Sequence, residues 1–387
     1  MDRKKDVVIL TIIGILTYAA LNFGHPVTPA FLEDVNINER YFGILFSTMA
    51  FSLALFSPFW GNKGDNYGRK YIVAIGIAGY GVGQLFFGYG STIQIILIGR
   101  MISGVFAAAI FSNIIASFSE ISTNKTRARN ISIITSVGML AGSIGYFIGG
   151  KLGMVFSPSN TLIIQGYFSI FVAIIILFFY PKTATIQTER KSFIKNLSLI
   201  KTIDDNILYF MFVVLFWTFA RNNVAKFFDV FLNNNGFTSE GIGTFIMITG
   251  IAGGIATLIF VPILAKRLKL LTMLKVILIF IIISLLITFT VKNNTVLYIS
   301  YLIYACLTVM YLSIEQTYIS KNITSHYGSI IGVRESFKSI GLVTGPLIVT
   351  FLFNNINSNT FYFNAIIYTI ALLLLLRFIH LQKNRRN

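Results

Sequence analysis

The chain has 387 residues, of which 55% are hydrophobic and only 12% are charged. Soluble globular domains carry roughly 25% charged residues, because their whole surface faces water. A chain of this length with about half that charge cannot keep ordinary soluble domains in solution. The composition therefore excludes a soluble enzyme and predicts an integral membrane protein.

The net charge is +17, from 31 Lys and Arg against 14 Asp and Glu. Such a balance often accompanies nucleic-acid binding, but here the basic residues lie in short polar gaps between long apolar runs. We therefore expect the lipid bilayer, and no nucleic acid, as a partner. The single cysteine, Cys306, excludes a disulfide framework and a multi-thiolate metal site. No metal or organic cofactor is indicated.

Twelve segments are long and apolar enough to cross a membrane, which takes about 20 residues of helix. The first of them is too long for a cleaved signal peptide, and further apolar segments follow directly. The predicted spans are 7–30, 41–60, 71–90, 93–118, 131–156, 161–180, 207–232, 241–264, 272–291, 295–320, 331–353 and 360–381.

The Lys and Arg residues of the connections predict the orientation. Twenty-one of them lie on the side of the N-terminus, and two, Arg40 and Lys292, lie on the other side. Because basic residues concentrate in cytoplasmic loops, we expect a multi-pass protein of the cell membrane with both termini in the cytoplasm.

The longest polar connection, 181–206, falls at the centre of the chain. It predicts an N-terminal six-helix half at 1–180, a cytoplasmic linker at 181–206 and a C-terminal six-helix half at 207–387. Such halves are related by an axis along the membrane normal. The fifth helix of each half carries a stretch of small residues, at 141–146 and 341–346, which lets neighbouring helices approach closely.

A polar motif joins the second and third spans. Its candidate functional residues are Gly61, Gly64, Asp65, Gly68, Arg69 and Lys70. The glycines permit a tight turn, and Asp65 can accept hydrogen bonds from backbone N–H groups at a helix start. The two basic residues can pair with acids or with lipid phosphates.

This segment resembles the G-x-x-x-D-x-x-G-R-K signature of the major facilitator superfamily, and the twelve-span layout resembles that family over the whole chain. The resemblance implies an all-α fold of twelve transmembrane helices in two halves, and transport by alternating access. It implies that the motif latches the halves on the cytoplasmic side, with Glu120 as the partner of Arg69. The alternative is a loop that carries only the positive charge of the cytoplasmic side.

The fourth span carries Arg100 and Gly104, a spacing that resembles the R-x-x-x-G motif of proton-coupled drug exporters in the same superfamily. Arg100 lies about seven residues, or roughly 10 Å, from the outer end of its helix. An intramembrane Arg costs about 2.5 kcal/mol or more unless it is paired or hydrated. We expect Arg100 to tune a proton-binding acid or to meet an anionic substrate group. The alternative is a side chain that extends to the outer interface.

The fifth span departs from the exporter signature G-x-x-x-G-P-x-x-G-G, because Tyr146 stands in place of the proline. The small residues of this stretch are Ala141, Gly142, Gly145, Gly149 and Gly150. Without a proline the backbone hydrogen bonds of the helix should continue unbroken. In the family this motif marks antiporters, so the direction of transport stays open.

The seventh span holds a polar cluster in its outer half. Asn222, Lys226 and Asp229 share one helix face by spacing, which predicts a hydrated polar site or, if that face lies at the outer rim, an ordinary interface pair. Arg221 lies deeper and is a functional candidate.

Three further groups of polar residues are candidates. Glu315 in the tenth span is either the proton carrier or a structural acid bonded to a helix end or to Lys321. His25 either titrates near neutrality or packs through a hydrogen bond. The neutral cavity-lining candidates are Asn22, Gln84, Asn113 and Gln316.

Arg100, Arg221 and Lys226 outnumber the intramembrane acids Asp229 and Glu315, so the cavity should prefer anionic or neutral molecules over cationic ones. We expect a monomer that performs proton-coupled efflux of small amphipathic molecules. The alternative is a proton-coupled uptake symporter for a sugar or carboxylate. The sequence contains none of the common catalytic motifs or a nucleotide-binding loop, so a membrane enzyme is a remote alternative.

Overall fold

The computed structural model describes residues 4–123, 126–181, 205–291, 293–322, 327–353 and 356–384. These residues form helices joined by turns, with no strand among them. Twelve of the helices are long and apolar enough to cross a membrane. This confirms the predicted fold class.

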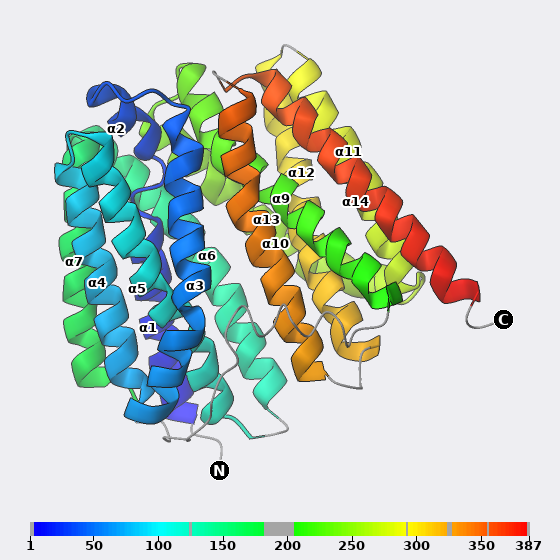
Figure 1. Cartoon of the computed structure of the whole chain (residues 1–387), viewed down its shortest axis with the longest axis horizontal. Coiled ribbons are helices and arrows are strands. Elements are labelled where there is room, and N and C mark those ends of the chain that lie inside the picture. Colours follow the sequence, from blue (N-terminus) through cyan, green and yellow to red (C-terminus); the bar gives the residue numbers. More distant parts are fainter. Residues whose placement is uncertain are drawn as a thin grey trace. The chain divides into compact units, whose positions relative to one another are not determined.

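The first seven helices run from the N-terminus to the centre of the chain (Figure 1). They are α1 (Lys4–Asn22), α2 (Thr28–Asp34), α3 (Tyr41–Tyr67), α4 (Arg69–Tyr89), α5 (Ile93–Glu120), α6 (Arg127–Val155) and α7 (Pro158–Phe179). The later helices are α9 (Asp205–Asn234), α10 (Ser239–Ala265), α11 (Leu270–Thr290), α12 (Asn294–Asn322), α13 (Tyr327–Leu352) and α14 (Ser358–Asn384).

The described helices divide between two compact units. The first contains α1 to α7 together with the segment Leu232–Ile248, and the second contains the rest of α9 and α10 with α11 to α14. The segment Leu232–Ile248 belongs to the later half by its position in the sequence and to the first unit by its contacts. The predicted linker 181–206 lies outside the described residues except at its two ends.

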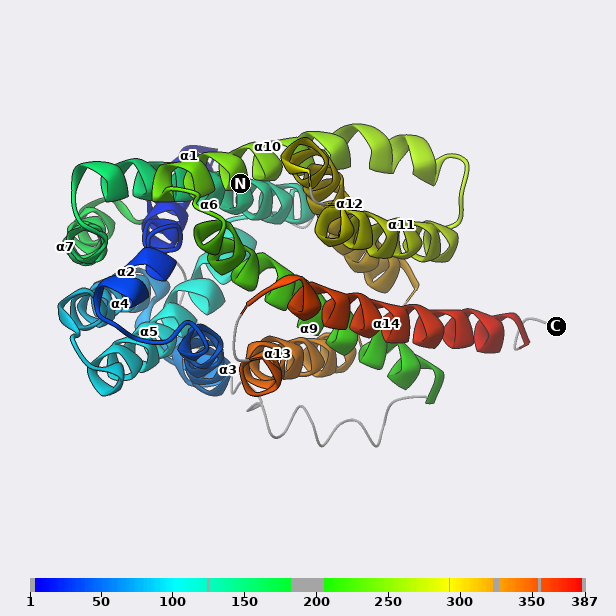
Figure 2. The same ribbon diagram turned by 90° about the horizontal axis from the view of Figure 1, so that it is seen from above.

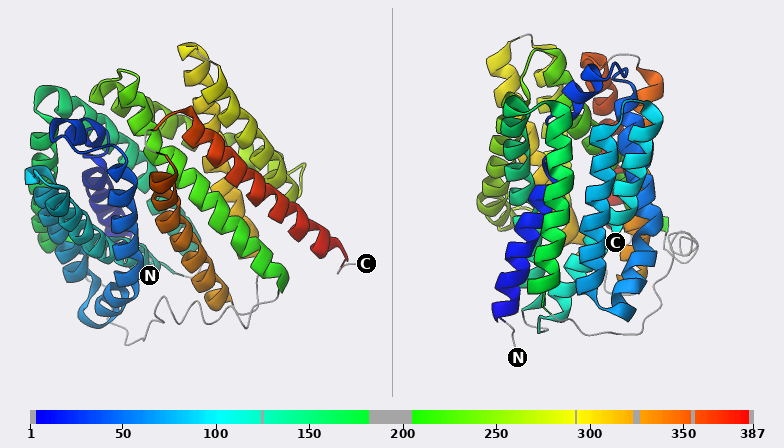
Figure 3. Two further views of the ribbon diagram at one scale, coloured as in Figure 1. Left: turned by 45° about the horizontal axis from the view of Figure 1, so that its top comes forward. Right: turned by 90° about the vertical axis from the view of Figure 1, so that its left-hand side faces the viewer.

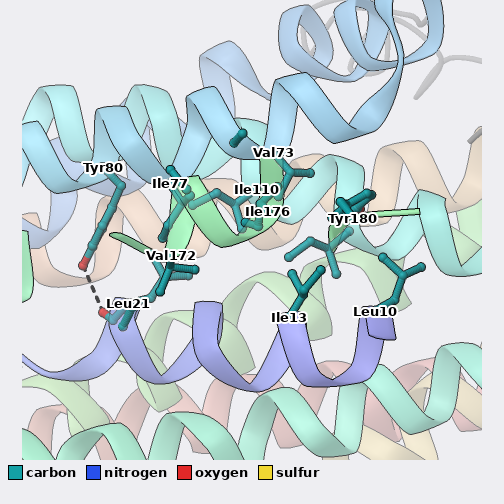
Figure 4. Packing of buried hydrophobic residues seen from close by; sticks show 14 of the residues in the cluster. Leu10, Ile13, Leu21, Val73, Ile77, Tyr80, Ile110, Val172, Ile176 and Tyr180 are labelled. Atoms are coloured by element: carbon teal, nitrogen blue, oxygen red, sulfur yellow. Dashed lines mark hydrogen bonds between the residues drawn. The ribbon is translucent and has the colours of Figure 1, made fainter. Parts of the chain in front are cut away.

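Within the first unit, α4 contacts both α5 and α7, α3 contacts α5, and α1 contacts α6 (Figure 2). The buried cluster between these helices consists mainly of aliphatic side chains, among them Ile13, Val73, Ile110 and Ile176 (Figure 4). Tyr80 is 1% exposed and donates its hydroxyl to the backbone oxygen of Leu21 at 3.0 Å. That bond gives a partner to a backbone carbonyl in the last turn of α1, where carbonyls have no partner within the helix.

In the second unit, α11 contacts α12 and α14 (Figure 3). Gly341 and Gly345 of α13 lie against the backbone of α9: a Cβ on Gly341 would be 2.6 Å from the Leu215 oxygen. In the first unit, a Cβ on Gly145 of α6 would be 2.5 Å from the Ala19 oxygen of α1. The small-residue stretches of the two fifth spans therefore both bring their helix close to the first span of the same half, as their composition predicted.

The first predicted span, 7–30, is wrong as a single helix. It is split into α1 and the short helix α2, with turns between Asn22 and Thr28. Pro26 lacks the N–H that a continuing helix needs, and Pro29 begins α2, where that N–H is not required.

The second predicted span ends too early. Helix α3 continues through Tyr67, so Gly61, Gly64 and Asp65 of the motif are helical. The chain turns at Gly68, whose φ of 90° lies in the region that favours glycine. The tight turn expected from three glycines is therefore made by one.

Candidate functional site

The motif residues meet at the junction between the end of α3, the start of α4 and the end of α5. Arg69 is 4% exposed and lies between two acids. Its Nε donates to Glu120 Oε1 at 2.6 Å, and its Nη2 pairs with Asp65 Oδ1 at 2.5 Å. The predicted pairing of Arg69 with Glu120 is therefore present. Asp65 lies inside the last turn of α3 rather than ahead of a helix start, and its carboxylate holds Arg69.

Asn113 completes this junction. Arg69 Nη1 donates to Asn113 Oδ1 at 3.1 Å, while Asn113 Nδ2 donates to the backbone oxygens of Ala109 at 2.9 Å and Trp60 at 3.2 Å. Asn113 is fully buried. From the sequence, Asn113 was only a neutral cavity-lining candidate, and its hydrogen bond to the Arg69 guanidinium was not predicted. A signal was available, since Asn113 and Glu120 lie two turns apart on α5.

Gly64 leaves the space that the Asn113 amide occupies. A Cβ on Gly64 would lie 2.7 Å from Asn113 Cγ and 3.2 Å from its Nδ2. Carbon atoms in ordinary contact are about 3.5–4.0 Å apart. The glycine is thus required by the neighbouring side chain rather than by the turn.

The other motif residues have different surroundings. Gly61 is buried in α3, and Lys70 is partly exposed at the start of α4. Lys63, also in the motif, lies over the rings of Phe59 and Tyr67 at 5.7 and 4.9 Å. The junction of α3, α4 and α5 therefore contains one buried cation and two carboxylates.

Arg100 is buried in α5, with 2% of its surface exposed. The alternative of a side chain that extends to the outer interface is therefore wrong in this structure. Its guanidinium carbon lies 3.9 Å from the centre of the Phe87 ring and 5.3 Å from that of Phe46. Its Nη2 lies 3.5 Å from Thr28 Oγ1, and its Nε has no hydrogen-bond partner among the described residues.

His25 lies in the same region as Arg100. Its ring stacks on Phe46 and on Tyr146, with centroid distances of 5.5 and 5.2 Å. Gln84, another of the neutral candidates, donates to Ser103 Oγ at 3.1 Å. The structure thus brings His25 and Arg100, which are 75 positions apart in sequence, to the same aromatic ring, that of Phe46.

Helix α6 runs without interruption through the expected motif, as the absence of proline predicted. Gly145 and Gly149 face α1; a Cβ on Gly149 would be 2.6 Å from the Phe23 carbonyl carbon. Gly142 lies near the Asn22 amide, 3.2 Å from such a Cβ. Gly150 instead faces the segment Leu232–Ile248, where its Cβ would be 2.5 Å from the Ser239 oxygen. The motif glycines therefore allow α6 to approach both α1 and the segment Leu232–Ile248 closely.

The polar residues of α9 differ in their burial and in their contacts. Asp229 is fully buried. Lys226 is partly exposed. Asn222 donates to the Leu342 oxygen of α13 at 3.3 Å. Arg221 is partly exposed, with its guanidinium 5.4 Å from the Trp217 ring centre, and it forms no ion pair with any residue in the described part of the second unit.

Glu315 of α12 is 1% exposed and accepts from Arg334 Nε of α13 at 2.8 Å. Arg334 also pairs with Glu335, which is bonded to Lys338 at 3.1 Å. The other Glu315 oxygen, Oε2, is buried without a hydrogen-bond partner in the described structure. Arg334 was not predicted as a partner, although a charged pair inside the predicted span 331–353 was a usable signal. The side chain of Lys321, considered as a partner instead, lies outside the described residues.

No group of His, Cys, Asp and Glu that could hold a metal ion is found among the described residues. Each unit therefore carries its own charged groups. The first has Arg69 between two carboxylates and the buried Arg100 over aromatic rings. The second has the Glu315–Arg334 pair and the partly exposed Arg221 beside Trp217. Such a set can bind charged groups and exchange ion-pair partners.

The chain is similar to known transporter proteins over most of its length. The sequence model of the Major Facilitator Superfamily matches residues 10–337. Multidrug resistance protein 1 of Bacillus subtilis (strain 168) is 26% identical over 385 residues, which is 96% of each chain. Quinolone resistance protein NorA of Staphylococcus aureus (strain COL) is 23% identical over 355 residues, covering 91% of this chain and 90% of NorA.

Solved structures share the fold at lower sequence identity. A mutant of the nucleoside transporter NupG has a TM-score of 0.81 at 12% identity, with 96% of this chain and 99% of that chain covered. The human organic anion transporter MFSD10 has a TM-score of 0.72 at 15% identity, with 97% and 100% covered.

Proposed function

Because the chain belongs to the Major Facilitator Superfamily, we propose that it exports small amphipathic molecules across the cell membrane in exchange for protons. It is a multi-pass membrane transporter, not an enzyme. The names of the relatives, which are multidrug and quinolone resistance proteins, favour export as the direction. The orientation proposed from the basic loops places both termini in the cytoplasm, and the unit of function is a monomer.

The observation that carries this proposal is the junction around Arg69. Asp65 of α3, together with Glu120 and Asn113 of α5, holds the single buried guanidinium of Arg69. Removing one partner of a buried pair leaves an uncompensated charge and costs about 3–5 kcal/mol. The bonds of Arg69 to these partners are either formed or broken. Such a group suits a latch that holds the protein in one conformation of an alternating-access cycle.

Glu315 is the proposed proton carrier. Its one hydrogen-bonded oxygen holds Arg334, and Arg334 has a second acid, Glu335, to which it stays bonded if Glu315 takes up a proton. Protonation of Glu315 therefore does not leave Arg334 without an anion. The buried Oε2 accepts no hydrogen bond from a described residue, so it is the oxygen proposed to bind the proton.

The proposed substrate charge follows from the two stacked arginines. Arg100 and Arg221 form no ion pair with a described carboxylate, whereas the two acids of the first-unit junction are bonded to Arg69. A molecule with a negative or neutral polar end is therefore favoured over a lipophilic cation. A proton-coupled uptake symporter is the second candidate, supported by Tyr146 in place of the antiporter proline.

The test uses inverted membrane vesicles with an inside-acid proton gradient and a panel of anionic, neutral and cationic amphiphiles. Export by proton exchange predicts accumulation of anionic or neutral compounds inside the vesicles, together with partial collapse of the gradient. A protonophore should abolish both, and vesicles that contain the Asp65→Asn variant should show neither. Outward movement of a sugar or carboxylate with protons would support the symporter instead.

A further inference from the structure

Arg100 carries a buried charge with too few partners. The guanidinium has five N–H donors, yet its one hydrogen bond to a described residue is the 3.5 Å contact with Thr28 Oγ1. The Thr28 hydroxyl is itself donated to the Gly24 oxygen at 2.6 Å, so it offers Arg100 a lone pair. The buried Nε has no partner in the described structure.

The acids of the first unit do not supply the missing charge. Arg100 forms no ion pair with any described Asp or Glu. Most of the described acids in this unit are bonded elsewhere: Asp65 and Glu120 to Arg69, Glu33 to Asn233, Glu39 to Asn234, and Glu240 to Lys151. The counter-charge is therefore open to a ligand.

The aromatic rings offset only part of the cost of burying this cation. A cation over an aromatic face gains about 0.5–2 kcal/mol, and the two rings here are those of Phe87 and Phe46. The penalty for burying an ion in a protein is several kcal/mol. An anion that reaches Nε would meet a charge that is desolvated and incompletely compensated.

Tyr146 adds a second polar group to this region. Its ring stacks on that of His25, and the His25 ring stacks on that of Phe46, over which the Arg100 guanidinium also lies. The Tyr80 hydroxyl is donated to Leu21, whereas Tyr146 extends from the stretch of α6 in which proline was expected and stacks on His25. The residue that departs from the exporter signature thus belongs to the aromatic group beside the buried cation.

We propose that Arg100 binds the carboxylate of an amphipathic substrate, with the Tyr146 hydroxyl as a second donor and with Phe46 and Phe87 against the adjoining apolar group. The proposal rests on the proposed transport function and names the charge class that this site selects. Guanidinium–carboxylate bonds are charge-assisted and directional. Arg100 is buried in this structure, so the carboxylate binds in a state that exposes Nε.

The experiment is equilibrium dialysis of the purified protein in lipid nanodiscs against three probes that share one ring system: 2-naphthoate, 2-naphthamide and a naphthyl trimethylammonium ion. We expect the wild type to bind the acid about tenfold or more tightly than the amide, and the cation most weakly. Arg100→Gln should reduce the affinity for the acid to that for the amide. Tyr146→Phe should weaken acid binding severalfold and leave amide binding unchanged.

Arg100→Lys and the exposed Arg40→Gln are the companion variants. Lysine keeps the charge but loses the planar fork, so we expect intermediate affinity for the acid even if Arg100→Gln fails to fold. Arg40→Gln should match the wild type, which excludes a general effect of net charge. Each variant is first checked for a cooperative thermal transition.

Three results would overturn the site: acid and amide bound equally by the wild type, no detectable binding of the acid at millimolar concentration, or unchanged affinity for the acid in folded Arg100 variants. The dialysis needs no proton gradient. Binding of the acid without accumulation in energised vesicles would therefore support the site and contradict the export proposal.

Discussion

Substitution of Gly64 by alanine tests the junction most directly. Gly64 lies in the last two turns of α3, and the added Cβ would be 2.7 Å from Asn113 Cγ. Because ordinary carbon contacts are about 3.5–4.0 Å, the amide must move by roughly 1 Å. Asn113 lies on a rigid helix and is hydrogen-bonded to two backbone oxygens, so this movement breaks its bonds rather than stretching them.

The expected cost comes from two effects. The lost bond from Arg69 Nη1 to Asn113 Oδ1 involves a charged donor, and such bonds contribute about 1.5–3 kcal/mol. Overpacking of a filled interior costs a further 1–3 kcal/mol or so. We therefore expect a clear fall in the thermal unfolding midpoint, and a transport rate at least about tenfold below the wild type, since 1.4 kcal/mol is a factor of ten.

The assay combines thermal unfolding of the purified protein with initial rates in energised vesicles. The matched control is Gly241→Ala, where the nearest atom to an added Cβ is at an ordinary 3.5 Å, so little change is expected. In the double variant Gly64→Ala/Asn113→Ala, the added Cβ no longer meets the Asn113 amide. The hydrogen bond from Arg69 to Asn113 is still absent. The unfolding midpoint of the double variant should exceed that of Gly64→Ala alone, while its rate should match Asn113→Ala. A wild-type midpoint for Gly64→Ala, or no recovery in the double variant, would refute the steric argument.

Three further predictions concern the charged groups. Asp65→Asn should nearly abolish vesicle transport while the protein remains inserted, because the amide replaces one of the two carboxylates that hold buried Arg69; a wild-type rate would contradict the latch. Glu315→Gln should remove the dependence of transport on the proton gradient in vesicles, because the amide cannot carry a proton. Retained gradient-driven transport would show that the proton is carried elsewhere. Lys151→Met, which breaks an exposed pair with Glu240, should shift the free energy of unfolding by no more than about 1 kcal/mol. A larger loss in denaturant titrations would mean that the Lys151–Glu240 pair is stronger than its exposure implies.

The fold was accessible from the sequence because the bilayer imposes a simple rule on it. Each crossing needs about 20 apolar residues with internally satisfied backbone groups, so span number and helical class follow from composition along the chain. The errors fell at helix ends. Pro26 and Pro29 split the first span, and α3 continued to Tyr67, because backbone sterics and neighbouring side chains decide helix ends.

The sequence by itself determined the membrane class, the twelve spans and the motif that pairs Arg69 with Glu120. Only the tertiary structure decided which charges meet. It placed Asn113 beside Arg69, Arg334 beside Glu315, and Tyr146 against His25. The physical reason is that hydrophobicity acts on each helix separately and can be read along the chain. A hydrogen bond or ion pair instead depends on a few ångströms between helices that are distant in sequence, and packing alone fixes that distance.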